Sequence, residues 1–234
     1  MISAVRTHCG KVRPSNQDAF LERPGLFPLY AVADGMGGHR GGNVASAMAV
    51  ESLRTMDISA LPEEAALAAA VMDANARIWQ RQLHDLSLSG MGTTLTALWE
   101  APDYLVLAHV GDSRAYRLRD GMLTQMTLDH SLVGELLRSG AITPDMARNY
   151  PYRNIVTRAV GTEASLTCDV LRADRQPGDR WLLCSDGLTE YAGSDQILSA
   201  LALPLQEAAD SLLAVALNGG GRDNITLLVL EVPA

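Results

Sequence analysis

An apolar run that ends in an aspartate set among glycines constrains this chain most strongly. Residues 29–33 (Leu-Tyr-Ala-Val-Ala) are typical of a buried strand, and Asp34 follows them directly. The glycines at positions 35, 37, 38, 41 and 42 allow the backbone to turn sharply and to expose its own carbonyl and amide groups. The pattern therefore predicts a carboxylate at the end of a strand, placed for chemistry.

Three further aspartates occupy comparable positions. Asp112 follows the apolar run 105–110, Asp186 follows 181–184, and Asp223 lies between a run of glycines and the apolar stretch 225–232. Each of them alone is typical of a turn, where Asp-Gly and Asp-Asn are common. Four such aspartates in one chain favour a convergent cluster of carboxylates. Oxygen-only ligands of this kind select hard cations such as Mg2+ or Mn2+.

Composition excludes several classes of protein. The 234 residues fit one large domain, with two small ones possible, and the 47% hydrophobic and 20% charged fractions are those of a globular protein. A net charge of -8 argues against a nucleic-acid partner and against an anionic membrane surface, because both reward Lys and Arg.

The cysteines and the N-terminal sequence indicate the compartment. Cys9, Cys168 and Cys184 are an odd number without Cys-x-x-Cys spacing, which supports neither a disulfide framework nor a structural zinc site. Residues 1–6 lack an apolar signal core, and no apolar run approaches the roughly 18 residues of a membrane span. We therefore expect a cytoplasmic protein, and we expect it to be a monomer.

The pattern of apolar residues predicts an α+β fold. Strands are expected at 2–8, 29–34, 95–99, 104–110, 115–118, 122–126, 166–171, 180–184 and 225–232, and helices at 44–53 with Asn43 as N-cap, 61–86, 132–139, 195–202 and 205–217. Asp120-Gly121 is the strongest hairpin signal, and the strands around it are expected to form a meander. The elements do not alternate regularly between strand and helix, which favours antiparallel sheets covered by helices.

The candidate residues suffice for phosphate chemistry. Two hard cations about 3.5–4 Å apart, bridged by a carboxylate, can activate a water and clamp phosphoryl oxygens. Asp34 is a candidate bridge, while Asp186 and Asp223 are candidates to complete the site. Arg13 suits a phosphate and His39 suits proton donation. On spacing alone, however, an exposed arginine and a turn aspartate are the favoured interpretation of Arg13 and the nearby Asp18.

Motifs across residues 13–224 resemble those of the metal-dependent (type 2C, PPM) protein serine/threonine phosphatases, in the same order. They are Arg13-x-x-Asn16-Gln17-Asp18, Asp34-Gly35-Met36-Gly37-Gly38-His39, Gly90-Met91-Gly92-Thr93-Thr94, Val110-Gly111-Asp112-Ser113-Arg114, Asp129-His130-Ser131, Ser185-Asp186-Gly187-Leu188 and Gly221-Arg222-Asp223-Asn224. Each motif alone is weak, but their common order is specific, and the chain is similar to a compact bacterial member.

The resemblance implies a four-layer αββα sandwich of two antiparallel sheets flanked by helices. It implies two core Mn2+ or Mg2+ ions bridged by Asp34, with the Gly35 carbonyl on one ion and Asp186 and Asp223 on the other. It also implies that Asp18 acts through metal-bound water and that Asp112 holds a weaker third ion, which shares Asp186. In addition, it implies that Arg13 binds phosphate and that His39 is the general acid.

The resemblance also implies the overall organisation and the partners. Residues 1–234 would form a single domain with a flap insertion at about 131–160, and no regulatory domain would be attached. The substrates would be phosphorylated proteins, with a bacterial serine/threonine kinase as the opposing enzyme. Gln17 and Asn43 depart from the family pattern, in which Glu is frequent, and this puts outer water networks in doubt more than activity.

Three other functions compete with this reading. A catalytically inactive relative that binds phosphoproteins is disfavoured, because Asp34, Asp186 and Asp223 are all present. A phosphatase of partner-switching transcription regulators is disfavoured by Arg13 and by Asp129-His130-Ser131, which that branch usually lacks. A nucleotide-binding fold would need a Gly-x-Gly-x-x-Gly turn inside a βαβ unit.

Two histidines and one cysteine need separate interpretation. His109 lies inside an apolar run and is expected to be a packed core residue, whereas no catalytic role is assigned to His130. Cys184 precedes Ser185-Asp186, but its apolar neighbours would raise its pKa, and a cysteine phosphatase would need a Cys-x5-Arg loop that residues 184–190 lack.

Overall fold

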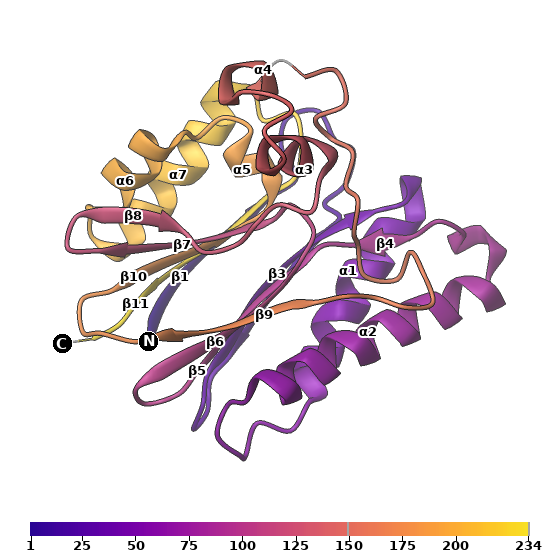
Figure 1. Cartoon of the computed structure of the whole chain (residues 1–234), viewed down its shortest axis with the longest axis horizontal. Helices are drawn as coiled ribbons and strands as arrows, with labels where there is room; N and C mark the ends of the chain where they lie inside the picture. The colour runs from indigo at the N-terminus through magenta and orange to yellow at the C-terminus, as the bar shows by residue number, and fades with distance from the viewer. Residues whose placement is uncertain (149, 234) are drawn as a thin grey trace.

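The computed structural model describes residues 1–148 and 150–233, except for the side chains of residues 38–40 and 148. Within these residues, two sheets lie face to face and each carries helices on its outer face (Figure 1). Every pairing between the described strands is antiparallel. The four layers confirm the predicted α+β sandwich.

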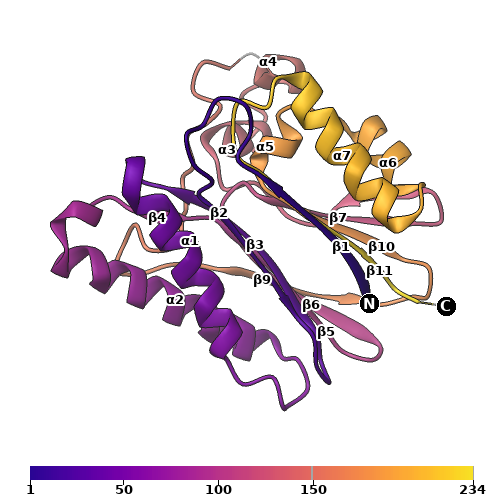
Figure 2. The same cartoon turned by 180° about the vertical axis from the view of Figure 1, so that it is seen from behind.

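The first sheet joins the two ends of the chain. Its order is β1 (Ile2–His8), β11 (Ile225–Glu231), β10 (Arg180–Cys184), β7 (Arg114–Arg119) and β8 (Met122–Gln125). Helices α6 (Ser194–Leu201) and α7 (Leu205–Gly219) cover its outer face (Figure 2). An apolar stripe docks α7 on the sheet, since its residues Ala208, Ala209, Leu212 and Ala216 are all fully buried.

The second sheet carries the central aspartate. Its order is β2 (Asp18–Arg23), β3 (Leu29–Met36), β5 (Leu95–Glu100), β6 (Tyr104–Val110) and β9 (Asp169–Asp174), and β4 (Gly92–Thr93) pairs with the end of β3. Helices α1 (Gly38–Thr55) and α2 (Glu64–His84) cover its outer face, and the short 3-10 helix η1 (Leu86–Leu88) follows them.

The two sheets bury an apolar layer between them. Tyr30, Leu98, Leu107 and Trp181 are among the side chains of this layer. Removal of this apolar area from water at about 25 cal/mol per Å2 is the main force that holds the sheets together. The short helices α3 (Leu132–Arg138), α4 (Pro144–Arg148) and α5 (Asp186–Thr189) gather at one end of the sandwich, away from the chain termini (Figure 1).

The structure corrects the predicted meander. The Asp120-Gly121 hairpin is confirmed: it joins β7 to β8, with φ of 51° and 76° at its two residues. However, β6 and β7 belong to different sheets, so the chain crosses from one sheet to the other at residues 111–113. An alternating apolar pattern specifies which face of a strand is buried, but it does not specify which neighbour the strand pairs with.

The start of the first helix also differs from the prediction. Helix α1 begins at Gly38, six residues before the predicted start, and Asn43 lies inside it as an exposed residue, not as its N-cap. The glycines here allow close packing: a Cβ on Gly35 would lie 2.1 Å from the carbonyl oxygen of Gly42. Glycine is therefore required where α1 crosses the end of β3.

One strand is shifted from its predicted range, and some short elements were not predicted. The strand predicted at 166–171 is β9 at Asp169–Asp174, because its register pairs Asp174 with Tyr104 and leaves Leu166 to pack against the helix-side core. Strand β2 and helices α4 and α5 were not predicted. Each is short, and short elements depend on tertiary contacts more than on local pattern.

Candidate active site

Asp18 and Asp34 lie side by side where β2 and β3 pair. The two residues are directly opposite each other in the register. Threonines fix the backbone of Asp34 on both sides: its amide donates to Thr94 Oγ1 at 2.9 Å, and its carbonyl accepts from the Thr94 amide and from Thr93 Oγ1, each at 2.9 Å. The motif Gly92-Thr93-Thr94 therefore positions the central aspartate.

The first sheet contributes Asp186 and Asp223 to the same place. Asp186 is the first residue of α5, directly after β10, and Asp223 lies just before β11. Ser185 joins the two sheets here, since its hydroxyl donates to Asp18 Oδ2 at 2.8 Å and accepts the Thr226 amide at 2.9 Å. The fold thus brings together aspartates that are far apart in the sequence, since Asp18 and Asp223 are separated by 205 positions.

Burial and mutual repulsion raise the pKa values of these carboxyl groups. The pKa of Asp18 rises to about 7, first because of burial and then because of the charges of Asp186 and Asp223. The pKa of Asp34 rises well above its ordinary value through burial and the charges of Asp18 and Asp186. The pKa of Asp186 is also raised, mainly by burial. Such a cluster calls for positive charge.

The donor atoms suit a hard divalent cation. Asp18 Oδ1 and Asp186 Oδ1 are buried and lack a hydrogen-bond partner among the described residues, and a buried oxygen of this kind is costly unless something positive meets it. Across the described residues, however, no three Asp, Glu, His or Cys side chains already form a cage for an ion. The carboxylate oxygens therefore fit Mn2+ or Mg2+ in their chemistry, but in the described part of the chain their side chains are not arranged as a preformed cage.

Arg13 is the cation that the structure places against the cluster. Its Nε donates to Asp223 Oδ1 at 2.8 Å and its Nη2 donates to Asp223 Oδ2 at 2.6 Å. This forked geometry is the one that suits a carboxylate or a phosphate. The structure therefore brings Arg13 and Asp223 together, as expected for one site. In this structure, however, the two side chains bind each other.

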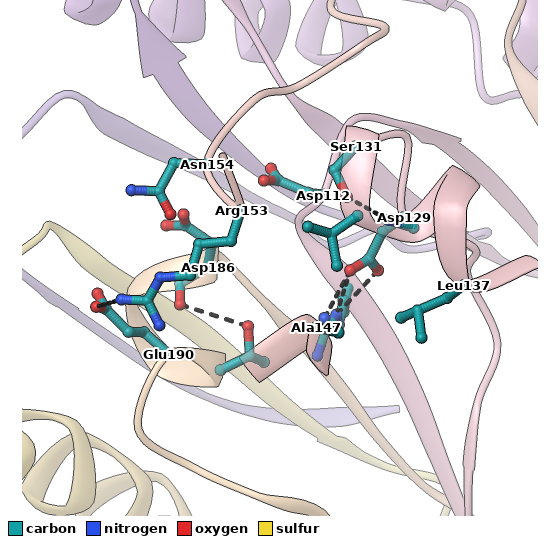
Figure 3. Close-up of a pocket in the computed structure, with 13 residues that line it drawn as sticks. Asp112, Asp129, Ser131, Leu137, Ala147, Arg153, Asn154, Asp186 and Glu190 are labelled. Atoms are coloured by element: carbon teal, nitrogen blue, oxygen red, sulfur yellow. Dashed lines mark hydrogen bonds and ion pairs between the residues drawn. The ribbon is translucent and has the colours of Figure 1, made fainter. Parts of the chain in front are cut away.

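Asp112 faces the cluster from the crossing between β6 and β7. Burial raises its pKa to about 7, followed by the charges of Asp186 and Asp129. Together with Asp186 it lines a cavity of about 440 Å3 that lies beneath α3 and α4 (Figure 3). The cluster of carboxylates therefore opens into a cavity.

Two ion pairs frame this cavity. Arg114 donates to Asp129 with its Nε at 2.9 Å and its Nη2 at 2.6 Å. Arg153, from the segment after α4, reaches Glu190 beside α5 at 2.7 Å (Figure 3). Asp129 and Arg114 belong to motifs that the sequence showed, but no role was predicted for them. Arg153 and Glu190 were not predicted at all, because two residues 37 positions apart leave no local signal of their ion pair.

His109 and Cys184 are both buried, as their apolar neighbours in the sequence indicated. His109 is a buried core residue as expected, between Thr96 and the Leu128 carbonyl, and burial lowers its pKa to about 4. Cys184 is fully buried and its pKa rises to about 12, which disfavours a thiolate nucleophile as expected. The predicted acid His39 has a side chain outside the described residues.

The antiparallel sandwich with a cluster of buried aspartates from both sheets is the arrangement that the resemblance implies for the phosphatase 2C class. The sequence profile of the family described as protein phosphatase 2C matches residues 7–217. The chain belongs to this family, as its motifs predicted.

Curated relatives carry the same class of name. The chain is 42% identical over 233 residues to the serine/threonine protein phosphatase PstP of Mycobacterium tuberculosis strain H37Rv, a match that covers 98% of this chain and 44% of the relative. It thus spans less than half the length of that protein. It is 41% identical over 241 residues to the serine/threonine phosphatase stp of Listeria monocytogenes serovar 1/2a, covering 99% of this chain and 96% of the relative.

Solved structures agree with the fold. The crystal structure of the catalytic domain of PstP in complex with two manganese ions superposes with a TM-score of 0.91 at 40% identity, and the match covers 100% of this chain and 98% of that one. Fold and family therefore agree with the expectations from the sequence. No helix in the described part of the chain has both the length and the apolar character needed to cross a membrane.

Proposed function

We propose that this chain hydrolyses phosphoserine and phosphothreonine on proteins and requires Mn2+ or Mg2+. The observation that carries the proposal is the meeting of Asp18, Asp34 and Asp186 from both sheets, where two buried carboxylate oxygens have no hydrogen-bond partner among the residues that the structure describes. The relatives named as serine/threonine phosphatases, and the manganese in the PstP structure, support it.

The proposed ligands are those that the family resemblance assigns. Asp34, the Gly35 carbonyl, Asp186 and Asp223 would hold the two core ions, with Asp34 contributing to both. Asp18 would contribute through water, and Asp112 would hold a weaker third ion. When bound, such ions supply an activated water and neutralise phosphoryl oxygens.

The remaining steps belong to side chains of this chain. Arg13 donates both arms of its fork to Asp223, and the same fork would hold the phosphoryl oxygens of the substrate once Asp223 releases it. His39 donates a proton to the leaving serine or threonine oxygen. Residues 131–160 act as a flap beside the cavity, and the whole chain works as a single-domain monomer.

Turnover of a phosphothreonine peptide by chelator-treated protein tests the function. We expect no turnover without metal and recovery when Mn2+ or Mg2+ is added. Asp34→Asn should remove turnover under both conditions, whereas the control Asp73→Asn, whose side chain is 60% exposed on α2, should behave as the wild type. Full turnover by the metal-stripped protein would refute the mechanism.

Two alternatives give different results in the same assay. A phosphoprotein-binding relative without activity would bind the peptide but release no phosphate at any metal concentration. A phosphatase of partner-switching regulators would act on such a regulator and leave the peptide intact. We propose an opposing serine/threonine kinase as the physiological counterpart, which phosphoproteomics of a deletion strain would identify.

A further inference from the structure

His130, in the motif Asp129-His130-Ser131, pairs with both polar groups of a single residue, Gly111. The amide of Gly111 donates to His130 Nδ1 at 3.0 Å, and the amide of His130 donates to the Gly111 carbonyl at 2.7 Å. Gly111 directly precedes Asp112 in the crossing between the sheets. His130 therefore holds the residue from which Asp112 projects.

Gly111 needs such a restraint because of its conformation. Its φ is +111°, which L side chains rarely adopt, and a Cβ there would lie 2.6 Å from the Thr94 side chain. Glycine loses more conformational freedom on folding than other residues. The two hydrogen bonds to His130 oppose that freedom at the position where the chain passes between the sheets.

The hydrogen bonds define the tautomer of the His130 ring. Because Nδ1 accepts the Gly111 amide, the ring proton lies on Nε2, which is 3.1 Å from Asp169 Oδ2. Arg158 Nη1 lies 3.1 Å from the same nitrogen and donates to Asp169 Oδ1 at 2.7 Å. Burial of the ring lowers the pKa of His130, and the positive charge of Arg158 lowers it further, against the opposing hydrogen bond to Asp169.

The ring is also held in place by packing. His130 is 3% exposed and lies against the ring of His109, with the two centroids 4.8 Å apart. His109 is fixed in turn by Thr96 and by the Leu128 carbonyl. A buried ring with this number of fixed neighbours can hold its hydrogen-bond partner in one orientation.

The same motif reaches the segment over the cavity. The carbonyl of His130 accepts the Thr157 amide at 2.8 Å, Ser131 Oγ caps α3 by accepting the Gly134 amide at 3.1 Å, and Asp129 binds Arg114. The crossing that carries Asp112 and the segment above the cavity therefore meet at His130.

We infer that His130 is a positioning residue for Asp112: its neutral Nδ1 and its backbone amide hold Gly111 so that the Asp112 carboxylate stays directed toward Asp186 and the cavity. The inference rests on the proposed role of Asp112 as a ligand of a third ion. Partners that orient ligands in this indirect way typically change metal affinity or activity by about 10–100-fold when removed.

Two substitutions separate the two ring nitrogens. In His130→Asn the amide oxygen can take the place of Nδ1 and accept from Gly111, whereas His130→Gln places its amide near Nε2 and loses the acceptor for Gly111. We expect His130→Gln to speed hydrogen exchange of the Gly111 amide at least about 10-fold in metal-free protein. It should weaken the Asp112-dependent Mn2+ binding event about 10–100-fold. His130→Asn should stay close to the wild type in both.

A measurement on the unmodified protein covers the case in which the variants do not fold. Nitrogen-15 NMR of labelled histidine should show His130 with an unprotonated Nδ1 and a protonated Nε2. In addition, Asp169→Ala removes the acceptor of the Nε2 proton and should accelerate exchange of the Gly111 amide. A proton on Nδ1 in the wild type would overturn the inference.

Asp112→Ala distinguishes this inference from the proposed function. If Asp112→Ala leaves every Mn2+ binding event unchanged, the third-ion role of Asp112 fails, and so does the inference that rests on it. If Asp112→Ala removes the weak event but His130→Gln changes neither that event nor the Gly111 exchange rate, the inference alone is overturned.

Discussion

The pair of Arg13 and Asp223 suggests a competition for one guanidinium. The fork of Arg13 fits the Asp223 carboxylate as well as it fits a phosphate, because both present two oxygens in one plane. Arg13 neutralises part of the negative charge, and burial raises the pKa of both Asp34 and Asp186, which favours their protonated forms. Binding of a cation therefore has to compete with Arg13 and with protons.

Replacement of Arg13 by alanine tests this competition. We expect Arg13→Ala to weaken inhibition by inorganic phosphate, because the fork is lost, and to leave Mn2+ affinity equal to or tighter than that of the wild type, because a competing cation is lost. Arg13→Lys keeps the charge but not the fork and should restore only part of the phosphate inhibition. Calorimetry that showed weaker Mn2+ binding in Arg13→Ala would contradict the competition.

His39 gives a second prediction for a single residue. Expulsion of a serine or threonine alkoxide needs a proton, whereas nitrophenolate leaves without one. His39→Ala should therefore lose about 10^2–10^4-fold in turnover of phosphothreonine peptide, as is typical for general acid catalysis, and much less with p-nitrophenyl phosphate. Equal losses on both substrates together with weaker metal binding would mean that His39 only supports the glycine loop.

At the scale of elements, the close crossing of α1 over the end of β3 positions the central aspartate. Sequence reasoning identified β3, Asp34 and the glycines, but it interpreted the glycines as a turn and placed the helix start six residues late. A run of glycines in a sequence does not reveal whether the chain turns sharply or packs closely there, because both depend on the absence of a Cβ. The contact between Gly35 and Gly42 is visible only in the folded chain.

Gly35→Ala tests this crossing. The added Cβ would lie 2.1 Å from the Gly42 carbonyl oxygen, so backbone must shift. We expect a loss of about 1–3 kcal/mol in the free energy of unfolding, as is common when a close-packed site is overfilled. Gly193→Ala is the matched control, because its φ is -77° and its nearest atom is 4.0 Å away. Chemical denaturation of both variants would reveal the difference, and equal stability would contradict the account.

At the scale of the molecule, the sandwich brings together residues that lie at opposite ends of the sequence. The motifs gave the family, the layers and the set of aspartates. The pairing partners of β6 and β7, the Arg13–Asp223 pair and the Arg153–Glu190 pair depend on contacts between distant segments, which no local pattern encodes. These contacts between distant segments explain why the strand pairing and the two ion pairs could not be predicted from the sequence.

The buried aspartates predict how the stability of the metal-free protein depends on pH. The pKa values of Asp18 and Asp112 are both raised to about 7 in the folded chain, above the roughly 3.9 of an unfolded aspartate. The folded state then binds more protons than the unfolded state, so stability falls as pH rises from about 4 through about 7. Melting temperatures of chelator-treated protein should fall over this range, and those of Asp18→Asn should fall less. A rising melting temperature would contradict the raised pKa values.

The most direct measurement of the central claim is the number of Mn2+ ions bound at equilibrium, measured alongside phosphothreonine turnover in the same samples. The account predicts two tightly bound ions in the wild type, turnover that rises with their occupancy, loss of both ions in Asp34→Asn, and loss of one ion in Asp186→Asn. Wild-type protein that turns over the peptide with no bound divalent ion, or Asp34→Asn protein that retains both ions and full turnover, would contradict it.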